Sequence, residues 1–417
     1  MRILIAQPTG DKKGHYGTYT THLCQEMAKL GHEIILVTNN IASDQYLDGK
    51  PPLFKIFVVG RGTLAFSKYD EALMSKRQLK YFFGYFRNSY KVVSEALRLS
   101  KPENADVVLI QDSEFLMASF ALMRRGRKLP PVVMYISAAN FSYGTYAGSM
   151  PMKLYKLFQR EVFKLTIGRQ IKAITVLGEW HVPRLRAQLG LSERFPIDVV
   201  PDGGGDPKAT LEKLEARKKL GVTHEGLVLL FFGMIRKDKG IENMFDALQK
   251  LDNVDFHLVM AGFPADYSKE QIESMVIKRG LGNKVTLKLE YVSEDDIPVY
   301  FSAADVSIMP YSKIYTGGSG PLSKQIGTYS KPVIASNVSE MGRLVSAYDF
   351  GLLSSPDDPV SLAEKIRAFA DSTLAQREQW GKNSYAFAMS KSWPSIAKSY
   401  VEVFERVLAA DPQKKRR

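Results

Sequence analysis

The sequence predicts an α/β protein built from two doubly wound domains, each a parallel sheet covered by helices on both faces. Short runs rich in Val and Ile alternate with longer segments of helical pattern along all 417 residues. These runs lack the polar–apolar alternation of strands that face water, so they are expected to be buried on both sides. At roughly 100–200 residues per domain, this length also favours two domains.

The first domain is expected to contain repeated strand–helix units. A helix is predicted over residues 18–30, ending at Gly31, and one or two more over residues 69–99. Such repeated units form doubly wound sheets. The runs that predict its strands are residues 3–6, 34–37, 54–59, 107–110, 132–136, 173–176 and 197–200.

A proline and three glycines, within residues 201–205, interrupt the pattern, and a charged stretch follows. The boundary is expected within 201–225, which gives domains over residues 1–203 and 204–390. A helix over residues 392–408 presents one apolar face near the end of the chain. The runs that predict strands in the second domain are residues 227–232, 256–261, 285–289, 306–309, 333–335 and 351–353.

Composition limits the classes of partner. A net charge of +13 and a pI near 9.4 favour an anionic partner, such as a phosphorylated substrate, an acidic membrane surface or nucleic acid. No helix-turn-helix, zinc-finger spacing or RNA-binding aromatic motif is present, so nucleic acid is not expected. The lone Cys24 excludes an internal disulfide. Without a cleavable signal or an apolar run near ~20 residues, a cytoplasmic location is expected.

Two loops of the second domain have the pattern of phosphate-binding sites. Residues 316–320 are small and precede Pro321, which suits the first turn of a helix, where backbone N–H groups favour an anion. Residues 231–240, FFGMIRKDKG, place Arg236 and Lys239 between a strand end at Gly233 and a helix start, and both cations suit phosphate oxygens. The alternative for residues 316–320 is a glycine-rich turn without a ligand, and the alternative for residues 231–240 is a solvated basic turn.

Since ligands of open α/β sheets bind at the carboxyl ends of the strands, a cleft between the two domains is expected. Residues 7–19 of the first domain contain Gly14, His15 and Tyr16 but no complete G-x-G-x-x-G, so a dinucleotide site is not supported. This loop is expected to close over phosphates. The side chains expected to contact acceptor hydroxyls are Tyr16, Asp112, Ser137 and Asn140.

Residues 153–172 form a basic, aromatic and amphipathic stretch. Such a helix either rests on an anionic membrane surface or packs on the core with a solvated basic side. Residues 81–90 leave the same two alternatives open.

Several segments resemble the retaining glycosyltransferases of the GT-B fold, the group that includes sucrose synthases and bacterial mannosyltransferases. The resemblance covers nearly the whole chain and is strongest over residues 228–353. The segments that carry it are GMIRKDKGI, LVMAGF, SAADVSIMPYS and KPVIASNVSEMGRLV in the second half, and LGHEI and VVPDGG in the first.

The resemblance implies transfer of a sugar from a nucleoside diphosphate donor, UDP favoured over GDP, to a hydroxyl of a sugar, glycan or lipid-linked acceptor with retention. It implies that Arg236 and Lys239 are the catalytic groups and that a helix near residues 391–410 completes the first domain. No metal or cofactor is expected. The implied donor-binding residues are Gly14, His15, Gly233, Arg236, Lys239, Tyr291, Gly318, Ser319, Gly320, Pro321, Leu322 and Gln325.

The chain departs from this family at two positions of the donor region, and it also lacks a histidine after a first-domain strand, where residues 135–140 read YISAAN. The family carries two glutamates eight positions apart, and here Gly317 and Gln325 stand in their place. Gln325 can still donate or accept a hydrogen bond, whereas Gly317 has no side chain. Because both glutamates are missing, a nucleotide-sugar epimerase or pseudo-glycosyltransferase remains an alternative function. The net charge also leaves a non-catalytic sugar-nucleotide binder as an alternative.

Overall fold

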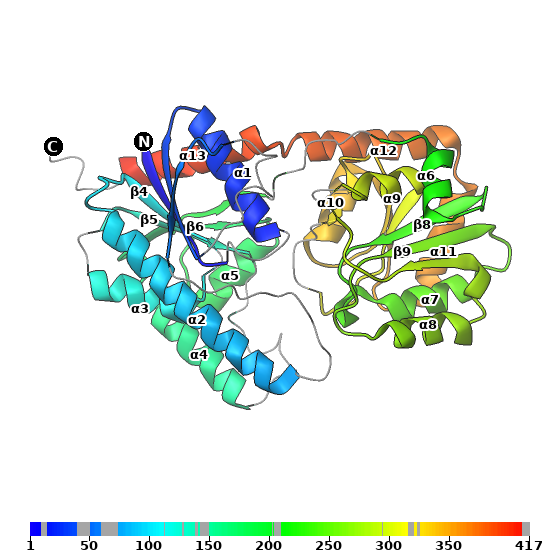
Figure 1. Cartoon of the computed structure of the whole chain (residues 1–417), viewed down its shortest axis with the longest axis horizontal. Coiled ribbons are helices and arrows are strands. Elements are labelled where there is room, and N and C mark those ends of the chain that lie inside the picture. The colour runs from blue at the N-terminus through cyan, green and yellow to red at the C-terminus, as the bar shows by residue number, and fades with distance from the viewer. Residues whose placement is uncertain are drawn as a thin grey trace. The chain divides into compact units, whose positions relative to one another are not determined.

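The chain folds into two α/β units (Figure 1). The computed structural model describes residues 1–9, 15–39, 51–59, 74–111, 113–126, 129–137, 141, 150–201, 203, 210–293, 295–315, 321–322 and 326–410, without the side chains of residues 15, 16, 18, 74–82, 151 and 152. Unit 1 comprises Met1–Asp202 and Trp393–Arg417, and unit 2 comprises Gly203–Ser392.

Unit 1 contains a parallel sheet in the order β3-β2-β1-β4-β5-β6-β7. The Val- and Ile-rich strands are largely buried, as the absence of alternation predicts. The strands are β1 (Arg2–Gln7), β2 (Glu33–Thr38), β3 (Lys55–Val58), β4 (Val107–Ile110), β5 (Val132–Ile136), β6 (Ile171–Val176) and β7 (Ile197–Val199). The helices are α1 (His15–Lys29), α2 (Met74–Leu99), α3 (Phe115–Arg125), α4 (Met150–Lys164), α5 (His181–Leu189) and α13 (Trp393–Ala409).

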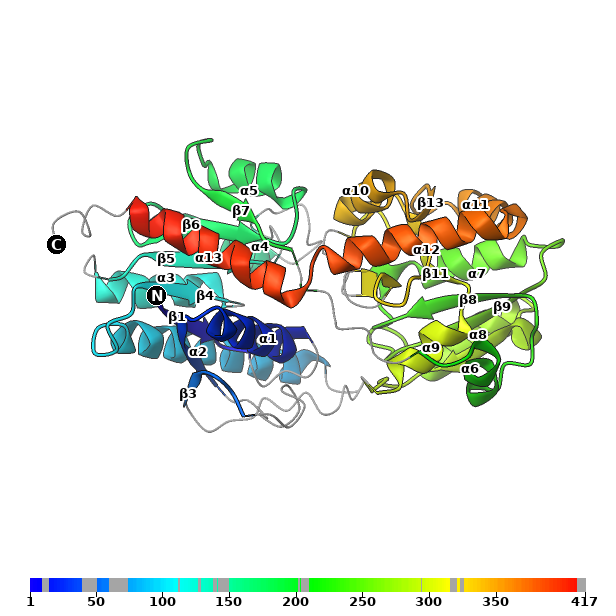
Figure 2. The same ribbon diagram turned by 90° about the horizontal axis from the view of Figure 1, so that it is seen from above.

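Helix α13 returns to unit 1 and lies beside α1, as Figures 1 and 2 show from two directions. The Tyr19 and Tyr400 hydroxyls are 3.3 Å apart, and the Trp393 ring meets Tyr19 edge-on at 5.4 Å between centroids. The apolar face predicted for this helix is therefore part of the core of unit 1.

Unit 2 contains a parallel sheet in the order β10-β9-β8-β11-β12-β13. Its strands are β8 (Leu227–Phe232), β9 (Phe256–Ala261), β10 (Val285–Lys288), β11 (Val306–Met309), β12 (Val333–Ser336) and β13 (Gly351–Ser354). Its helices are α6 (Lys213–Leu220), α7 (Ile241–Gln249), α8 (Lys269–Lys278), α9 (Ile297–Ala303), α10 (Ser339–Tyr348), α11 (Pro359–Asp371) and α12 (Leu374–Met389), with short 3-10 turns η4 (Lys237–Lys239) and η5 (Gly282–Lys284).

Strand β8 shows why the sheet needs helices on both faces. Val228 and Leu230 belong to one apolar cluster, while Leu229 and Phe231 belong to the cluster on the opposite face. Alternate side chains of a strand point to opposite faces, so a strand that is apolar throughout requires two cores. The fold class predicted from the sequence, α/β with two parallel sheets, is confirmed.

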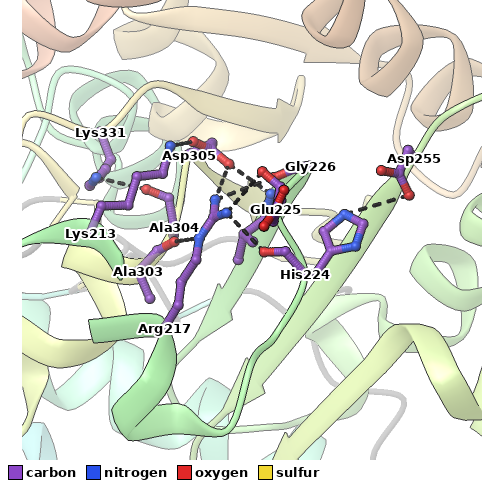
Figure 3. Close-up of polar contacts among 11 residues, drawn as sticks. Lys213, Arg217, His224, Glu225, Gly226, Asp255, Ala303, Ala304, Asp305 and Lys331 are labelled. Carbon is purple, nitrogen blue, oxygen red and sulfur yellow. Dashed lines mark hydrogen bonds and ion pairs between the residues drawn. The ribbon is translucent and has the colours of Figure 1, made fainter. Parts of the chain in front are cut away.

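At the amino ends of β8 and β11 a buried arginine ties the strands to α6, as Figure 3 shows. Arg217 is 4% exposed. Its five N–H groups donate to the carbonyl oxygens of Ala303, His224, Glu225 and Gly226 and to the carboxylate of Asp305. Asp305 also accepts from the Val228 N–H at 2.7 Å and pairs with Lys213. Every donor of this guanidinium is therefore used within unit 2.

Candidate active site

The candidate site lies at the carboxyl ends of β8 and β11 in unit 2. Strands β9 and β10 lie on one side of β8 in the sheet, whereas β11, β12 and β13 lie on the other side. The direction of the chain across the sheet therefore reverses between β8 and β11. In open parallel sheets, this reversal leaves a crevice at the carboxyl edge where ligands bind.

Glycines bring the backbone of this edge close together. Gly233, directly after β8, has φ +117°, and a Cβ there would lie 3.1 Å from the Pro321 side chain. A Cβ on Gly262, which follows β9 and has φ +147°, would lie only 1.8 Å from the Gly233 carbonyl oxygen. Pro321, at the end of the first predicted phosphate loop, therefore lies against the start of the second.

Arg236 is held within its own loop. Its Nε and Nη2 donate to the two carboxylate oxygens of Asp238 at 2.9 and 2.7 Å. Burial lowers the pKa of Arg236, but the hydrogen bonds and charge of Asp238 outweigh burial and hold the pKa above its ordinary value. The guanidinium is half-buried and remains charged, and a planar fork of this kind can exchange a carboxylate for phosphate oxygens.

Lys239 is the most buried cation of this loop, with 7% of the residue exposed. Its ammonium lies 3.6 Å from the ring centroid of Tyr311 and 4.3 Å from that of Tyr315. The two rings meet edge-on, 4.7 Å apart. Burial, followed by the charge of Arg236, lowers the pKa of Lys239 well below its ordinary value.

The loop that carries these cations is fixed to the segment that carries the two tyrosines. Gly240 has φ +65°, and a Cβ there would lie 1.9 Å from the carbonyl oxygen of Pro310. The Ser312 N–H donates to the Asp238 carbonyl oxygen at 3.1 Å. Only glycine allows so close an approach with this backbone conformation, so Gly240 sets the position of Lys239.

The other donor-binding residues predicted from the sequence lie in unit 2, in unit 1 or outside the described residues. Tyr291 follows β10 and is 58% exposed, whereas the Leu322 side chain is buried in the core. His15 begins α1, and its side chain is not described. The predicted positions outside the described residues are Gly14, Gly318, Ser319, Gly320 and Gln325, and Gly317, where the family has a glutamate, also lies outside them.

On unit 1, the predicted acceptor residues are not tested. Tyr16 lies in α1 without a described side chain, and Asp112 and Asn140 are outside the described residues. A buried network that was not predicted lies near the carboxyl ends of β1 and β4. Gln7 donates to the Thr20 hydroxyl at 3.0 Å, which donates to Gln111 at 2.9 Å. The sequence signal for this network was the glutamine at the end of each of the two apolar runs, Gln7 as the last residue of β1 and Gln111 directly after β4.

Glu114, another buried residue that the sequence analysis missed, caps α3. Its carboxylate accepts from the backbone N–H groups of Leu116 and Met117 and from the side chains of Tyr155 and Gln159. Burial, followed by the charge of Glu114, raises the pKa of Tyr155. Since four donors satisfy this carboxylate, it stabilises α3 and its contact with α4. The signal was a carboxylate between a strand and a helix.

Among the described residues, no group of His, Cys, Asp and Glu side chains has the arrangement of a metal site. None of the helices searched in this part of the chain has the length and apolar character required to span a membrane.

Residues 212–387 match the family described as Glycosyl transferases group 1. These residues lie within unit 2 and include the loop with Arg236 and Lys239. It is 29% identical over 209 residues to 2-deoxystreptamine glucosyltransferase of Streptomyces kanamyceticus, covering 49% of this chain and 52% of the relative. It is 26% identical over 241 residues to D-inositol 3-phosphate glycosyltransferase of Geodermatophilus obscurus, covering 51% of each. The chain thus spans about half the length of the curated relatives that it matches.

Solved structures show the same fold over the whole chain. Sucrose-phosphate synthase from Thermosynechococcus elongatus superposes with a TM-score of 0.73 at 19% identity, covering 99% of this chain and 100% of that one. Anabaena HepE in complex with UDP superposes with a TM-score of 0.70 at 17% identity, covering 97% and 100%. The chain therefore has the GT-B fold, with two Rossmann-like units.

Proposed function

We propose that the protein transfers a sugar from a nucleoside diphosphate donor to a hydroxyl acceptor, with retention at the anomeric carbon. The observation that carries the proposal is the position of Arg236 and Lys239 on the loop that follows Gly233, which lies against Pro321 at the point where the chain direction reverses. Two cations on one short loop suit a diphosphate. UDP is favoured as the nucleotide, since HepE of this fold binds UDP and UDP-glucose.

In the proposed reaction the bond between the anomeric carbon and the diphosphate oxygen breaks, and negative charge develops on the diphosphate. Arg236 and Lys239 stabilise this charge, and a single preorganised donor of this kind contributes about 2.7–4 kcal/mol in enzymes. The acceptor oxygen attacks from the same face, and its proton passes to a donor phosphate oxygen. The exposed ring of Tyr291 is proposed to contact the nucleoside.

The acceptor is proposed to be a hydroxylated sugar, glycan or lipid-linked glycan, bound by unit 1. One observation favours an acceptor at an anionic membrane surface. Helix α4 exposes Met150, Leu154 and Phe158, which are spaced four residues apart and form one apolar stripe. Lys153 is exposed on the same helix, and Lys164 is partly exposed. An apolar stripe beside basic residues is typical of helices that lie in a membrane interface.

The membrane contact is tested with Leu154→Asp/Phe158→Asp and vesicles that contain phosphatidylglycerol. The native protein is expected to bind these vesicles at low salt and to dissociate at high salt, and the variant is expected not to bind. A matched change on the exposed end of α8, Ile277→Asp, should leave vesicle binding unchanged. Equal binding of all three proteins would contradict the contact.

The donor is tested by thermal shift with UDP-, GDP- and ADP-sugars, because a ligand of the folded protein raises its melting temperature. A UDP-sugar is expected to give the largest shift, and Lys239→Met should abolish it. Transfer assays with the same donors distinguish the alternatives. A free epimerised sugar nucleotide formed without acceptor would indicate an epimerase, and binding without any turnover would indicate a non-catalytic binder. The absence of any shift would contradict the donor site.

A further inference from the structure

The ammonium of Lys239 has an unusual environment for a buried charge. A buried lysine is ordinarily paired with a carboxylate, because an unpaired buried charge is costly. Within the described part of the chain, no carboxylate lies within ion-pairing distance of Lys239, and its near neighbours are the faces of Tyr311 and Tyr315. Asp238 directly precedes Lys239 in the sequence, but its carboxylate accepts hydrogen bonds from Arg236.

We propose that Tyr311 and Tyr315 form an aromatic cage that positions the charged ammonium of Lys239 for the donor diphosphate. The two tyrosines are positioning residues that act through Lys239, and the inference rests on the proposed function. They lie on the loop after β11, whereas Lys239 lies on the loop after β8, and these strands are neighbours.

The chemistry of the ring face explains why a cage suits this task. The face of an aromatic ring attracts a cation, and this attraction is stronger at desolvated sites than at exposed ones. A carboxylate would stabilise the ammonium too, but it would cancel the charge and accept its hydrogen bonds. Ring faces leave the N–H donors available and the net charge unchanged. The cage therefore keeps a buried cation able to bind a phosphate.

Backbone contacts fix the two sides of the cage to each other. Gly240 lies against Pro310, and the Ser312 N–H is bonded to the Asp238 carbonyl oxygen. These contacts are on either side of the cation in sequence, so the rings and the lysine are held by backbone as well as by side chains. Tyr315 also directly precedes residues 316–320, the predicted glycine-rich phosphate loop. The cage thus connects the two predicted phosphate loops along the chain.

The cage is tested by removing the rings while keeping comparable apolar bulk. UDP and GDP affinities are measured by calorimetry for Tyr311→Leu/Tyr315→Leu and for Tyr311→Phe/Tyr315→Phe. The Leu variant is expected to bind the nucleotide at least 10-fold more weakly, while the Phe variant, which retains both ring faces, stays within about 3-fold of the native protein. Uridine and guanosine, which lack the diphosphate, should bind all three proteins equally.

Both sets of changes are repeated in a Lys239→Met background, which separates the two proposals. If the rings act through Lys239, replacing them there has little further effect on nucleotide affinity. An equal loss in both backgrounds, or an equal loss with Phe and Leu, would overturn the cage. If Lys239→Met alone leaves UDP and GDP affinity unchanged, the donor site itself is wrong. Should the double Leu variant not unfold cooperatively, Tyr311→Leu, which removes the nearer ring, provides the same comparison.

Discussion

In unit 2, buried cations lie both at the amino ends of the strands (the amino edge) and at their carboxyl ends (the carboxyl edge). The two sets of cations have different partners. At the amino edge, Arg217 donates all five N–H groups to protein acceptors and is paired with Asp305 (Figure 3). At the carboxyl edge, Arg236 pairs with Asp238, its one carboxylate partner among the described residues, and Lys239 lies against two ring faces. The first arrangement is complete without a ligand, whereas the second leaves charge and donors for one.

This difference teaches how to separate structural cations from binding cations in a basic protein. Residue type and local charge do not distinguish Arg217 from Arg236, because each arginine is followed directly by a lysine in a charged segment. The number of satisfied donors does distinguish them. A fully bonded guanidinium has no capacity for a phosphate, so its loss should change stability, while loss of a partly bonded one should change binding.

The largest expected effect is that of Arg217→Met. Removing this guanidinium leaves the Asp305 carboxylate partly buried without its arginine, and such losses cost about 3–5 kcal/mol. Chemical denaturation monitored by tryptophan fluorescence measures the change. Arg236→Met is the matched control at the other edge and should alter unfolding by less than about 1 kcal/mol. Equal destabilisation by both variants would break the comparison.

A pair of glycines sharpens the comparison further. Gly221 and Gly240 both follow a helical turn with φ near +70°, but only at Gly240 would a Cβ collide, with the Pro310 carbonyl oxygen. Gly221→Ala should cost about 1 kcal/mol of stability and leave UDP binding unchanged. Gly240→Ala should cost more and weaken UDP binding at least 10-fold, because the Lys239 loop is displaced. Calorimetry with both variants checks this, and weak binding by Gly221→Ala would contradict it.

Lys331, at the amino edge beside Arg217, gives a pH-dependent prediction. Burial lowers the pKa of Lys331 from 10.5 to about 8, and its ammonium donates to the Ala304 carbonyl oxygen at 2.7 Å. The folded protein holds this proton less tightly than the unfolded chain, so the charge costs stability below pH 8 and the cost fades as the pH rises toward 10.5.

Lys331→Met should therefore raise stability by about 1–2 kcal/mol at pH 7, with no gain near pH 10.5. Thermal unfolding at several pH values measures the difference from the native protein. A gain that does not fall with pH would show that the added apolar contact, and not the lost charge, is responsible.

The smallest expected effect is that of Asp238→Asn at the carboxyl edge. This change removes the carboxylate that competes with phosphate for Arg236 and adds one unit of positive charge to the loop. Partly exposed ion pairs contribute about 0.2–1 kcal/mol, so UDP affinity should rise about 2- to 5-fold. A titration with UDP measures it. A fall in affinity would mean that Asp238 mainly orients the guanidinium for the donor.

The strands of both sheets could be predicted from the sequence because fully buried parallel strands have an unmistakable composition. LVLLFF over β8 and VVLI over β4 are apolar at every position, and the strand ends agree within one or two residues. The helix that returns at Trp393 was predicted from its apolar face. These signals are local, so tertiary contacts only reinforce them.

Several residues could not be predicted because their partners are distant in sequence. The segment KLEARKKL has the composition of a solvated linker and was placed in the domain boundary, yet it forms α6 and contains buried Arg217. Asp305, the partner of Arg217, is 88 residues away. Lys239 was predicted as a phosphate ligand from its loop, but nothing local indicated Tyr311 and Tyr315. The predicted residues at 316–320 and in the acceptor set remain untested predictions.

The return of α13 to unit 1 affects the order in which the chain can fold as it is translated. Tyr19 can form its contact with Tyr400 only after the ribosome has added Tyr400, which lies 381 residues later in the chain. At roughly 5–20 residues per second this delay is about 20–75 s. Unit 2 needs nothing beyond Ser392 and can close first. The amino-terminal unit is therefore synthesised first and completed last, and until then the surface of α1 that α13 covers is a natural binding site for chaperones.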